Sequence, residues 1–153
     1  MVNVPVATNR KARFEFFILE TFEAGIVLTG TEIKSVRERR VNLKDSFARF
    51  EGAELWLQNL HISPYDKGSY YNHDEKRPRK LLMHRGEIVR LIGKIKEKGL
   101  TLIPLSMYLK EGRWAKVEMA LAKGKQQHDK RDAIADRDAK REIERAARRR
   151  DRD

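Results

Sequence analysis

The sequence predicts a mainly β protein, a small antiparallel barrel with two or three helices and a charged C-terminal tail. Three observations predict this class. About six short segments rich in β-branched and aromatic residues are separated by turn residues, as in small closed sheets. Residues 84–99 repeat their apolar side chains with a helical period. Beyond residue 122, apolar side chains become too sparse to build a core.

The first predicted strand covers residues 14–20 (FEFFILE), which can bury one apolar face. The EAG at 23–25 is expected to turn the chain into a second strand, IVL. Gly30 and Thr31 are expected to end that strand and to cap a short helix, EIKSVRER. The N-terminal region therefore predicts two strands followed by one helix.

Two hairpins are predicted further along the chain. SFARF and ELWLQNLHI flank a turn at residues 51–52, and LTLIPLSMYLK and RWAKVEMALAK flank a turn at Gly112. Pro104 predicts a sheet edge or a β-bulge in the second hairpin, because proline has no backbone N–H to donate. Residues 63–80, rich in turn formers and charge, are predicted to form a loop between the hairpins.

The clearest predicted helix is HRGEIVRLIGKIKEKG at residues 84–99, with Gly99 as its stop. Its apolar residues recur at i, i+3, i+4 and i+7 and so share one face: Ile88, Leu91, Ile92 and Ile95. Six short strands with helices at the ends of the sheet fit an antiparallel barrel of the OB type. Such barrels often bind nucleic acid, although a fold alone is a weak reason to assign a function.

Residues 123–153 form a predicted basic tail on a barrel of residues 1–122. The tail holds twelve Lys and Arg against eight Asp and Glu, a net charge of +4, which leaves +7 for the barrel. We expect the tail to be disordered alone, because it buries too little apolar surface to offset backbone ordering. Helix is latent in it, since apolar residues recur every four positions at Ala135, Ala139, Ile143 and Ala147.

The composition favours a polyanionic partner. The chain of 153 residues has a net charge of +11, a pI near 10.0 and 37% charged residues. The alternative is an ordinary solvated basic surface. The absence of cysteine excludes a disulfide framework and a cysteine-ligated zinc site. No apolar run is long enough to span a bilayer and no signal-peptide pattern opens the chain, so we expect a cytoplasmic protein that does not bind membranes.

No motif predicts catalysis, a metal or a cofactor. The sequence contains no phosphate-binding loop, nucleophile elbow or dinucleotide fingerprint. The four histidines, His61, His73, His84 and His128, do not pair at helical metal-binding spacing. NHDE at residues 72–75 is better explained as a solvated loop than as a metal site. We therefore expect a binding protein and not an enzyme.

Three basic segments, at residues 9–13, 37–40 and 77–80, combine guanidinium groups with lysines and suit phosphate binding. Three tyrosines precede the last segment and could stack on unpaired bases, although partly buried tyrosines of an ordinary loop explain them as well: Tyr65, Tyr70 and Tyr71. Glu23 is either a solvated turn residue or an acceptor for a base edge or a ribose hydroxyl.

Several blocks, in order, carry a resemblance to a known family. They are NRKARFEFFILETFEAGIVLTGTEIKSVR, NLKDSFARF, HISPY, RPRKLLMH, LTLIPLSMY and AKGKQQHDKRD. Together they resemble SmpB, the bacterial tmRNA-binding (SsrA-binding) family, from residue 9 to about residue 145. The resemblance implies an OB-type barrel in the bacterial cytoplasm that binds the tRNA-like domain of tmRNA, and that helps to deliver alanyl-tmRNA to stalled ribosomes in trans-translation without covalent chemistry.

The resemblance also implies site residues. Asn9, Glu23, Leu82 and His84 fall at tmRNA-contacting positions of the family, and the basic block at 77–80 matches its R-x-R-K-L-L pattern. The sequence departs from the family at Asp74–Glu75, where many members have Asp-Pro, and this leaves the shape of the 72–79 loop open. The complete predicted tmRNA-binding set is Asn9, Lys11, Arg13, Glu23, Lys34, Arg37, Arg77, Arg79, Lys80, Leu82 and His84.

For the tail, the resemblance implies a role in the decoding site and the vacant mRNA channel of the small ribosomal subunit, where it becomes ordered. HDKR at 128–131 matches the decoding-centre motif of the family. The predicted set is Lys123, Lys125, His128, Asp129, Lys130, Arg131, Arg137 and Arg141. We expect a monomeric adaptor with tmRNA and small-subunit rRNA as partners. Two alternatives remain, a generic basic single-strand binder and the OB domain of an RNA-processing enzyme.

Overall fold

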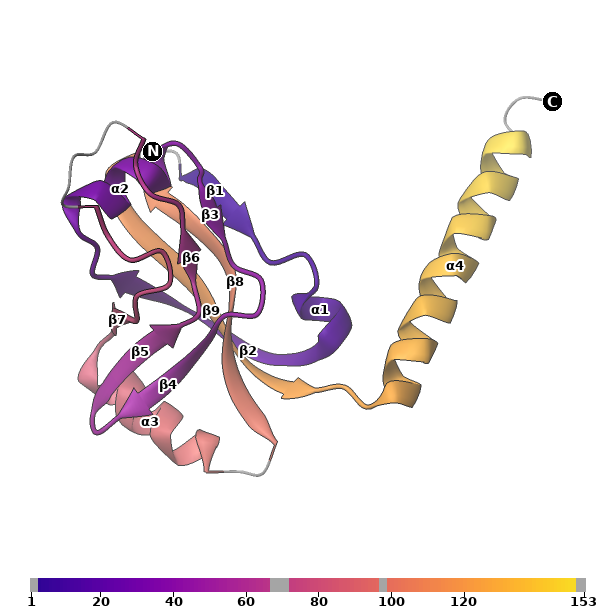
Figure 1. The fold of residues 1–153 in the computed structure, drawn as a ribbon. Coiled ribbons are helices and arrows are strands. Elements are labelled where there is room, and N and C mark those ends of the chain that lie inside the picture. The colour runs from indigo at the N-terminus through magenta and orange to yellow at the C-terminus, as the bar shows by residue number, and fades with distance from the viewer. Residues whose placement is uncertain (1–2, 67–71, 97–98, 151–153) are drawn as a thin grey trace.

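Three long strands form one side of the barrel. A computed structural model describes residues 3–66, 72–96 and 99–150 (Figure 1). Strands β8 (Leu100–Lys110) and β9 (Trp114–Gly124) form the predicted second hairpin, and β2 (Phe16–Ile26) pairs antiparallel with the other edge of β9. The turn between β8 and β9 uses Gly112 at φ +69°, a left-handed conformation that glycine adopts without strain.

Four shorter strands complete the sheet. Strands β4 (Phe47–Glu51) and β5 (Glu54–Gln58) form the first predicted hairpin, and β7 (Arg79–Leu82) links β5 to β2. Because β4 pairs with β8 and β8 pairs with β9, the sheet closes on itself. Strand β1 (Val4–Thr8) adds to β8, and β3 (Val41–Asn42) pairs separately with β6 (His61–Ile62). The prediction of a mainly β antiparallel barrel is confirmed.

The barrel interior is filled by aliphatic and methionine side chains from every wall. Alternation on β5 buries Leu55 and Leu57 while Trp56 between them is half-buried. Met107 on β8 and Met119 on β9 are likewise fully buried. Burying side chains of this size stabilises the fold by about 1.5–3 kcal/mol each. Pro104 lies beside a register shift of the β8–β9 pair, so the predicted bulge is confirmed.

Helices cover the barrel ends. Helix α2 (Gly30–Arg37) lies at one end and α3 (Arg85–Ile95) at the other (Figure 1). The predicted apolar face of α3 packs inward, with Leu91 fully buried and its neighbours on that face half-buried. Glu20 of β2 holds the outer side of α3 through ion pairs with Arg90 and Lys94.

Three local predictions are wrong. The loop expected at residues 63–80 ends before Arg79, because Arg79 and Lys80 already pair with β5 as the start of β7. The strand expected from residue 14 starts at Phe16, because residues 12–15 form the short helix α1 (Ala12–Glu15), whose Ala12 is buried in a second apolar cluster. The turn expected at residues 23–25 is absent: β2 continues through it, because β9 offers hydrogen-bond partners as far as the Gly25–Lys116 pair. The close approach of Leu82 explains Gly25, where an added Cβ would lie 3.3 Å from the Leu82 Cβ.

The cap of α2 also differs from the prediction. Thr29, and not Gly30 or Thr31, is the N-cap residue: its side chain accepts from the Glu32 N–H, and Glu32 Oε1 accepts from the Thr29 N–H at 2.9 Å. This reciprocal pair is a capping box. It leaves Thr31 free to hydrogen-bond to His73 at 2.9 Å, in the following loop.

The tail is helical in the structure. Strand β9 continues to Gly124, two residues beyond the expected end of the barrel at 122, and α4 (Gln127–Arg150) then extends away from it (Figure 1). The described side chains of α4 beyond Lys130 are all exposed. The helical form of the tail agrees with the prediction, whereas its disorder in the absence of the ribosome stays a prediction.

Removing the Thr29 cap tests the start of α2. We expect Thr29→Ala to lower the free energy of unfolding by about 1 kcal/mol, because the Glu32 N–H then lacks its acceptor. Urea denaturation followed by tryptophan fluorescence measures this loss. Thr29→Ser keeps the hydroxyl and should stay close to the parent, and an alanine variant as stable as the serine variant would contradict the assigned cap.

Candidate nucleic-acid interface

Three predicted tmRNA-binding residues share one hollow. Glu23 comes from the middle of β2, Leu82 from the end of β7 and His84 from the residue that precedes α3. They line a depression of about 290 Å³ together with Glu87 and Lys116. Leu82 is 52% exposed and His84 is exposed with no hydrogen bond from its side chain to the helix, so both can contact a ligand.

Glu23 is held as a carboxylate in this hollow. The Tyr108 hydroxyl donates to one of its oxygens, and the Lys110 ammonium lies 3.5 Å from the other. The Tyr108 hydrogen bond is the largest cause that lowers the pKa of Glu23, and desolvation opposes it only in part. The carboxylate is 41% exposed, so it keeps free lone pairs for an amino group or a ribose hydroxyl.

Helix α2 and the start of β7 present the exposed cations of the predicted set. Lys34 and Arg37 point to solvent from α2, and the Lys34 ammonium lies 5.3 Å above the ring of Tyr65. Lys80 is 39% exposed and lies 3.5 Å from Glu54. Exposed pairs of this kind contribute little to stability, so these cations can exchange partners for phosphates. Tyr70 and Tyr71, proposed as stacking residues, lie outside the described residues.

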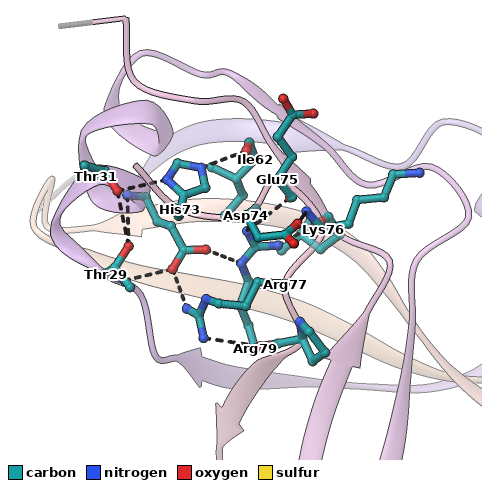
Figure 2. Close-up of polar contacts among 12 residues, drawn as sticks. Thr29, Thr31, Ile62, His73, Asp74, Glu75, Lys76, Arg77 and Arg79 are labelled. Carbon is teal, nitrogen blue, oxygen red and sulfur yellow. Dashed lines mark hydrogen bonds and ion pairs between the residues drawn. The ribbon is translucent and has the colours of Figure 1, made fainter. Parts of the chain in front are cut away.

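Arg79 does not belong to this exposed set. Its side chain is completely buried, its Nε donates to a Glu32 oxygen, and its terminal nitrogens donate to the carbonyls of Leu60, Asp74 and Glu75 (Figure 2). Every face of the guanidinium is therefore occupied by protein. The prediction that Arg79 contacts phosphate is wrong, because its donors are used to fix the loop before β7.

Glu32 is the centre of this buried network. It bonds to Arg77 and Arg79 through its two oxygens and also closes the capping box of α2 (Figure 2). Desolvation raises the pKa of Glu32, but hydrogen bonds from Arg77 and the Thr29 N–H and the charge of Arg79 outweigh it, so the net pKa is lowered. Arg77, predicted to bind RNA, is thus engaged with Glu32 while one third of its side chain stays exposed.

His73 holds the 72–79 loop against α2. One ring nitrogen lies 2.8 Å from the Ile62 carbonyl and the other 2.9 Å from the Thr31 hydroxyl (Figure 2). The carbonyl only accepts, so Nε2 carries a proton in this arrangement. Asn72 adds two hydrogen bonds to the Tyr65 backbone. These bonds define the loop conformation that the sequence left open.

Asn9, Lys11 and Arg13 lie apart from the Glu23 hollow. Asn9 and Lys11 line a different depression, together with α1 and β4 residues, and none of its lining residues is shared with the first. The Asn9 side-chain amide donates to the Pro104 carbonyl at 3.0 Å, so it supports the bulge in β8. Lys11 and Arg13 are exposed on and beside α1. Asn9 and Lys11 are therefore separate from the hollow that Glu23, Leu82 and His84 share.

The first residues of the tail are fastened to the barrel. The Lys125 backbone N–H donates to the Glu15 carbonyl at 2.8 Å, and its ammonium donates to the Arg13 carbonyl at 3.0 Å and lies 5.0 Å above the Phe17 ring. Asp129, in the first turn of α4, accepts at 3.0 Å from the N–H of Gln126, the residue before the helix. Beyond this point the predicted decoding-site cations are half-buried at Lys130 and exposed at Arg131, Arg137 and Arg141.

The sequence analysis missed the role of Glu32. The spacing Thr29-x-x-Glu32 is that of a capping box and would have identified the helix start. Nothing in the sequence indicated that the same carboxylate binds two arginines 45 and 47 positions later. Tyr108 and Lys110, which hold Glu23, were also missed, although their spacing of two places them on one face of a strand.

Within the described part of the chain, no helix combines the length and the apolar content needed to cross a bilayer. The same residues contain no group of three His, Asp or Glu side chains placed to hold a metal ion.

Comparisons with known proteins all identify the same family. The model of the family described as "SmpB protein" matches residues 6–149. The SsrA-binding protein of Desulforudis audaxviator is 66% identical over 143 residues, which cover 94% of this chain and 93% of the relative. The SsrA-binding protein of Carboxydothermus hydrogenoformans is 62% identical, with 94% and 95% covered.

A solved structure, described as "tmRNA-SmpB: a journey to the center of the bacterial ribosome", contains a similar chain. Its TM-score is 0.69 at 53% sequence identity, and the match covers 86% of this chain and 95% of that one. At this identity the similarity extends to the sequence and is not limited to the fold.

Arg79 is expected to act on stability. Arg79→Ala should lower the free energy of unfolding by about 3–5 kcal/mol, because it leaves the buried Glu32 carboxylate short of a partner. Lys80→Ala removes a cation from the next position, exposed and 3.5 Å from its partner, and should cost less than about 1 kcal/mol. Urea denaturation compares the two. An Arg79→Ala protein with parental stability but weak RNA binding would restore Arg79 to the interface.

Proposed function

The chain belongs to the SmpB family, and from this premise we propose that it is an adaptor that binds the tRNA-like domain of tmRNA and delivers it to stalled ribosomes in trans-translation. The observation that carries the proposal is the convergence of Glu23, Leu82 and His84. The three residues come from different elements, and they line one hollow. The relatives are named SsrA-binding proteins, which supports the RNA-binding part of this proposal.

The hollow offers three kinds of contact to RNA. The ionised Glu23 accepts hydrogen bonds from a ribose hydroxyl or a base edge, which a lysine cannot do. Leu82 supplies an apolar surface to a base or sugar. Lys116 in the hollow and Lys110 beside Glu23 supply positive charge for flanking phosphates. This combination of an acceptor, an apolar surface and cations favours recognition of a folded RNA site over simple charge neutralisation.

Arg79 contributes indirectly in this proposal. The network around Glu32 ties α2, which carries Lys34 and Arg37, to β7, which carries Lys80. One third of the Arg77 side chain stays exposed beside this network. Asn9, Lys11 and Arg13 lie apart from the Glu23 hollow, beside the start of the tail, and we propose that they contact tmRNA there.

We propose that the tail from Lys123 to Arg141 binds small-subunit rRNA in the decoding site and the vacant mRNA channel. Its cations Lys130, Arg131, Arg137 and Arg141 can pair with phosphates, and the flat ring of His128 can stack on a base. We still expect the tail to be disordered in the absence of the ribosome, although α4 is helical in the structure. The protein acts as a monomer in the bacterial cytoplasm, performs no covalent chemistry and needs no cofactor.

A generic basic single-strand binder is the competing function. Such a protein would bind tmRNA and unrelated RNA of the same length and would rely on phosphates alone. Competition binding with the tRNA-like domain, an elongator tRNA and unstructured RNA separates the two functions. Loss of discrimination among these RNAs would overturn the adaptor proposal.

Substitutions in the hollow should weaken tmRNA binding while the fold survives. Glu23→Ala and Leu82→Asp should each raise the Kd for the tRNA-like domain about tenfold or more, since each removes a contact worth about 1.5–3 kcal/mol. A mobility-shift titration measures this effect. Glu51→Ala and Leu19→Asp change similarly exposed residues outside the hollow, at 54% and 56% exposure, and should bind like the parent. Equal effects of both pairs would contradict the assigned surface.

Removing the tail should separate binding from tagging. Truncation after Lys125 should leave the Kd for tmRNA within about twofold of the parent, because the barrel keeps its charge of +7. Tagging of stalled peptides in a reconstituted translation reaction should be abolished. A truncated protein that tags at the parental rate would refute the two-part function.

His128 and Asp129 should carry much of the tail's specificity. His128→Ala with Asp129→Ala should reduce tagging further than the change in charge explains, because it removes both the stacking ring and the acceptor for the Gln126 N–H at the start of α4. Asp129→Asn keeps an acceptor for the Gln126 N–H and serves as the control for that hydrogen bond. If the asparagine variant tags as poorly as the double variant, charge at residue 129 is the deciding factor.

A further inference from the structure

An apolar groove lies beside the Glu23 hollow, and apart from Leu82 and Lys116 its lining takes no part in the contacts proposed so far. Its volume is about 330 Å³, and it runs between β2, α2 and the tip of the β8–β9 hairpin. Its base consists of the buried side chains Ile26, Val36 and Leu109. Exposed apolar side chains stand at its edge, with Val27 at 44%, Leu82 at 52% and Trp114 at 53% exposure.

Trp114 is the unusual residue of this groove. The other tryptophan, Trp56, is half-buried on β5, and its ring N–H donates to Glu54 at 3.2 Å. Trp114 has no such hydrogen bond among the described residues, and its ring lies 5.8 Å from the Arg113 guanidinium. The first residue of β9 thus exposes the largest aromatic surface available to a side chain, next to a cation.

The groove has a positive edge. Arg113 and Lys116 both line it, and neither lies within 4 Å of a carboxylate of the described residues. The Lys116 ammonium lies across Gly25, 3.6 Å from where a Cβ on that residue would be. Within the described residues neither cation forms an ion pair, so both can bind an external anion.

The groove is continuous with the proposed tmRNA surface. Gly25, Leu82 and Lys116 line both the groove and the Glu23 hollow. A ligand that contacts Leu82 from the hollow side is therefore adjacent to the groove. The same RNA chain can reach both places with neighbouring nucleotides.

We propose that this groove binds an unpaired base of the tRNA-like domain of tmRNA, with Trp114 as the stacking surface. Arg113 and Lys116 bind the phosphates that flank this base. The inference rests on the proposed function, and it adds a base-binding subsite to the surface of Glu23, Leu82 and His84. An indole next to a guanidinium suits the flat face of a base, and phosphates follow each base along the chain.

Affinity measurements test this subsite. Trp114→Ala should raise the Kd for the tRNA-like domain about 5- to 100-fold, the range found when one stacked base is lost, and Trp114→Phe should raise it less than Trp114→Ala. Trp56→Phe changes the other tryptophan and should bind like the parent. Arg113→Met should weaken binding and lower its salt dependence, whereas Arg49→Met, also exposed, should do neither.

Tryptophan fluorescence tests stacking without removing Trp114. In the Trp56→Phe protein Trp114 is the only tryptophan, and its emission should fall and become protected from acrylamide as the tRNA-like domain is added. In the Trp114→Phe protein the emission of Trp56 should stay nearly constant. Thermal melting of all variants checks that they are folded.

The outcomes separate this inference from the function on which it rests. Suppose that the parent protein discriminates the tRNA-like domain from other RNAs, that Trp114→Ala binds this domain as tightly as the parent does, and that Trp114 emission does not change when the RNA is added. The base-binding subsite is then refuted and the proposed function stands. If Trp114→Ala binds the RNA normally but fails to tag stalled peptides, the groove meets a ribosomal or protein surface, which also overturns the inference. A parent protein without discrimination refutes the function itself.

Discussion

The structure around the proposed interface depends on one buried ion pair, between Glu32 in α2 and Arg79 in β7. Both side chains are completely buried, so each loses its hydrogen bonds to water and must replace them with hydrogen bonds to protein groups. Glu32 does so with Arg77 and the Thr29 N–H, and Arg79 with three backbone carbonyls. The pair therefore constrains a helix start, a loop and a strand at once, and it joins the helix that carries Lys34 and Arg37 to the strand that carries Lys80.

This constraint separates the charged residues into two groups that look alike in the sequence. Arg77, Arg79 and Lys80 stand within four positions in a basic segment. The Arg77 side chain is one third exposed, Arg79 is buried and Lys80 is 39% exposed. They differ because the loop turns the chain after Arg77 and because successive residues of β7 point to opposite faces of the sheet. The buried arginine orders the surface and the exposed neighbours can bind phosphate. Glu23 shows the same division among acids, since it is exposed and ionised while Glu32 is buried and paired.

Local patterns explain why much of the fold was predictable. The hairpins, the Pro104 bulge and the apolar face of α3 follow from periodicity and turn residues within each segment. The passage of β2 through residues 23–25 was not predictable, because its partners on β9 lie more than ninety positions away. The burial of Arg79 was not predictable either, because its partner Glu32 lies 47 positions away in the sequence. Family resemblance supplied Glu23, Leu82 and His84 as single positions, and only the fold placed them in one hollow, apart from Asn9.

Because Lys125 attaches the start of the tail to the barrel, a small rotation there moves the far end of α4 by a large distance. Two hydrogen bonds hold the root of the helix against α1, and 24 helical residues span about 36 Å beyond it. A rotation of only about 10° at residues 125–126 would displace the far end by about 6 Å, more than one helical turn of rise. Small changes in orientation at residues 125–126 are therefore amplified along the helix. The direction of its outer half depends on the contacts of Lys125 with the Phe17 ring and with two carbonyl groups of α1.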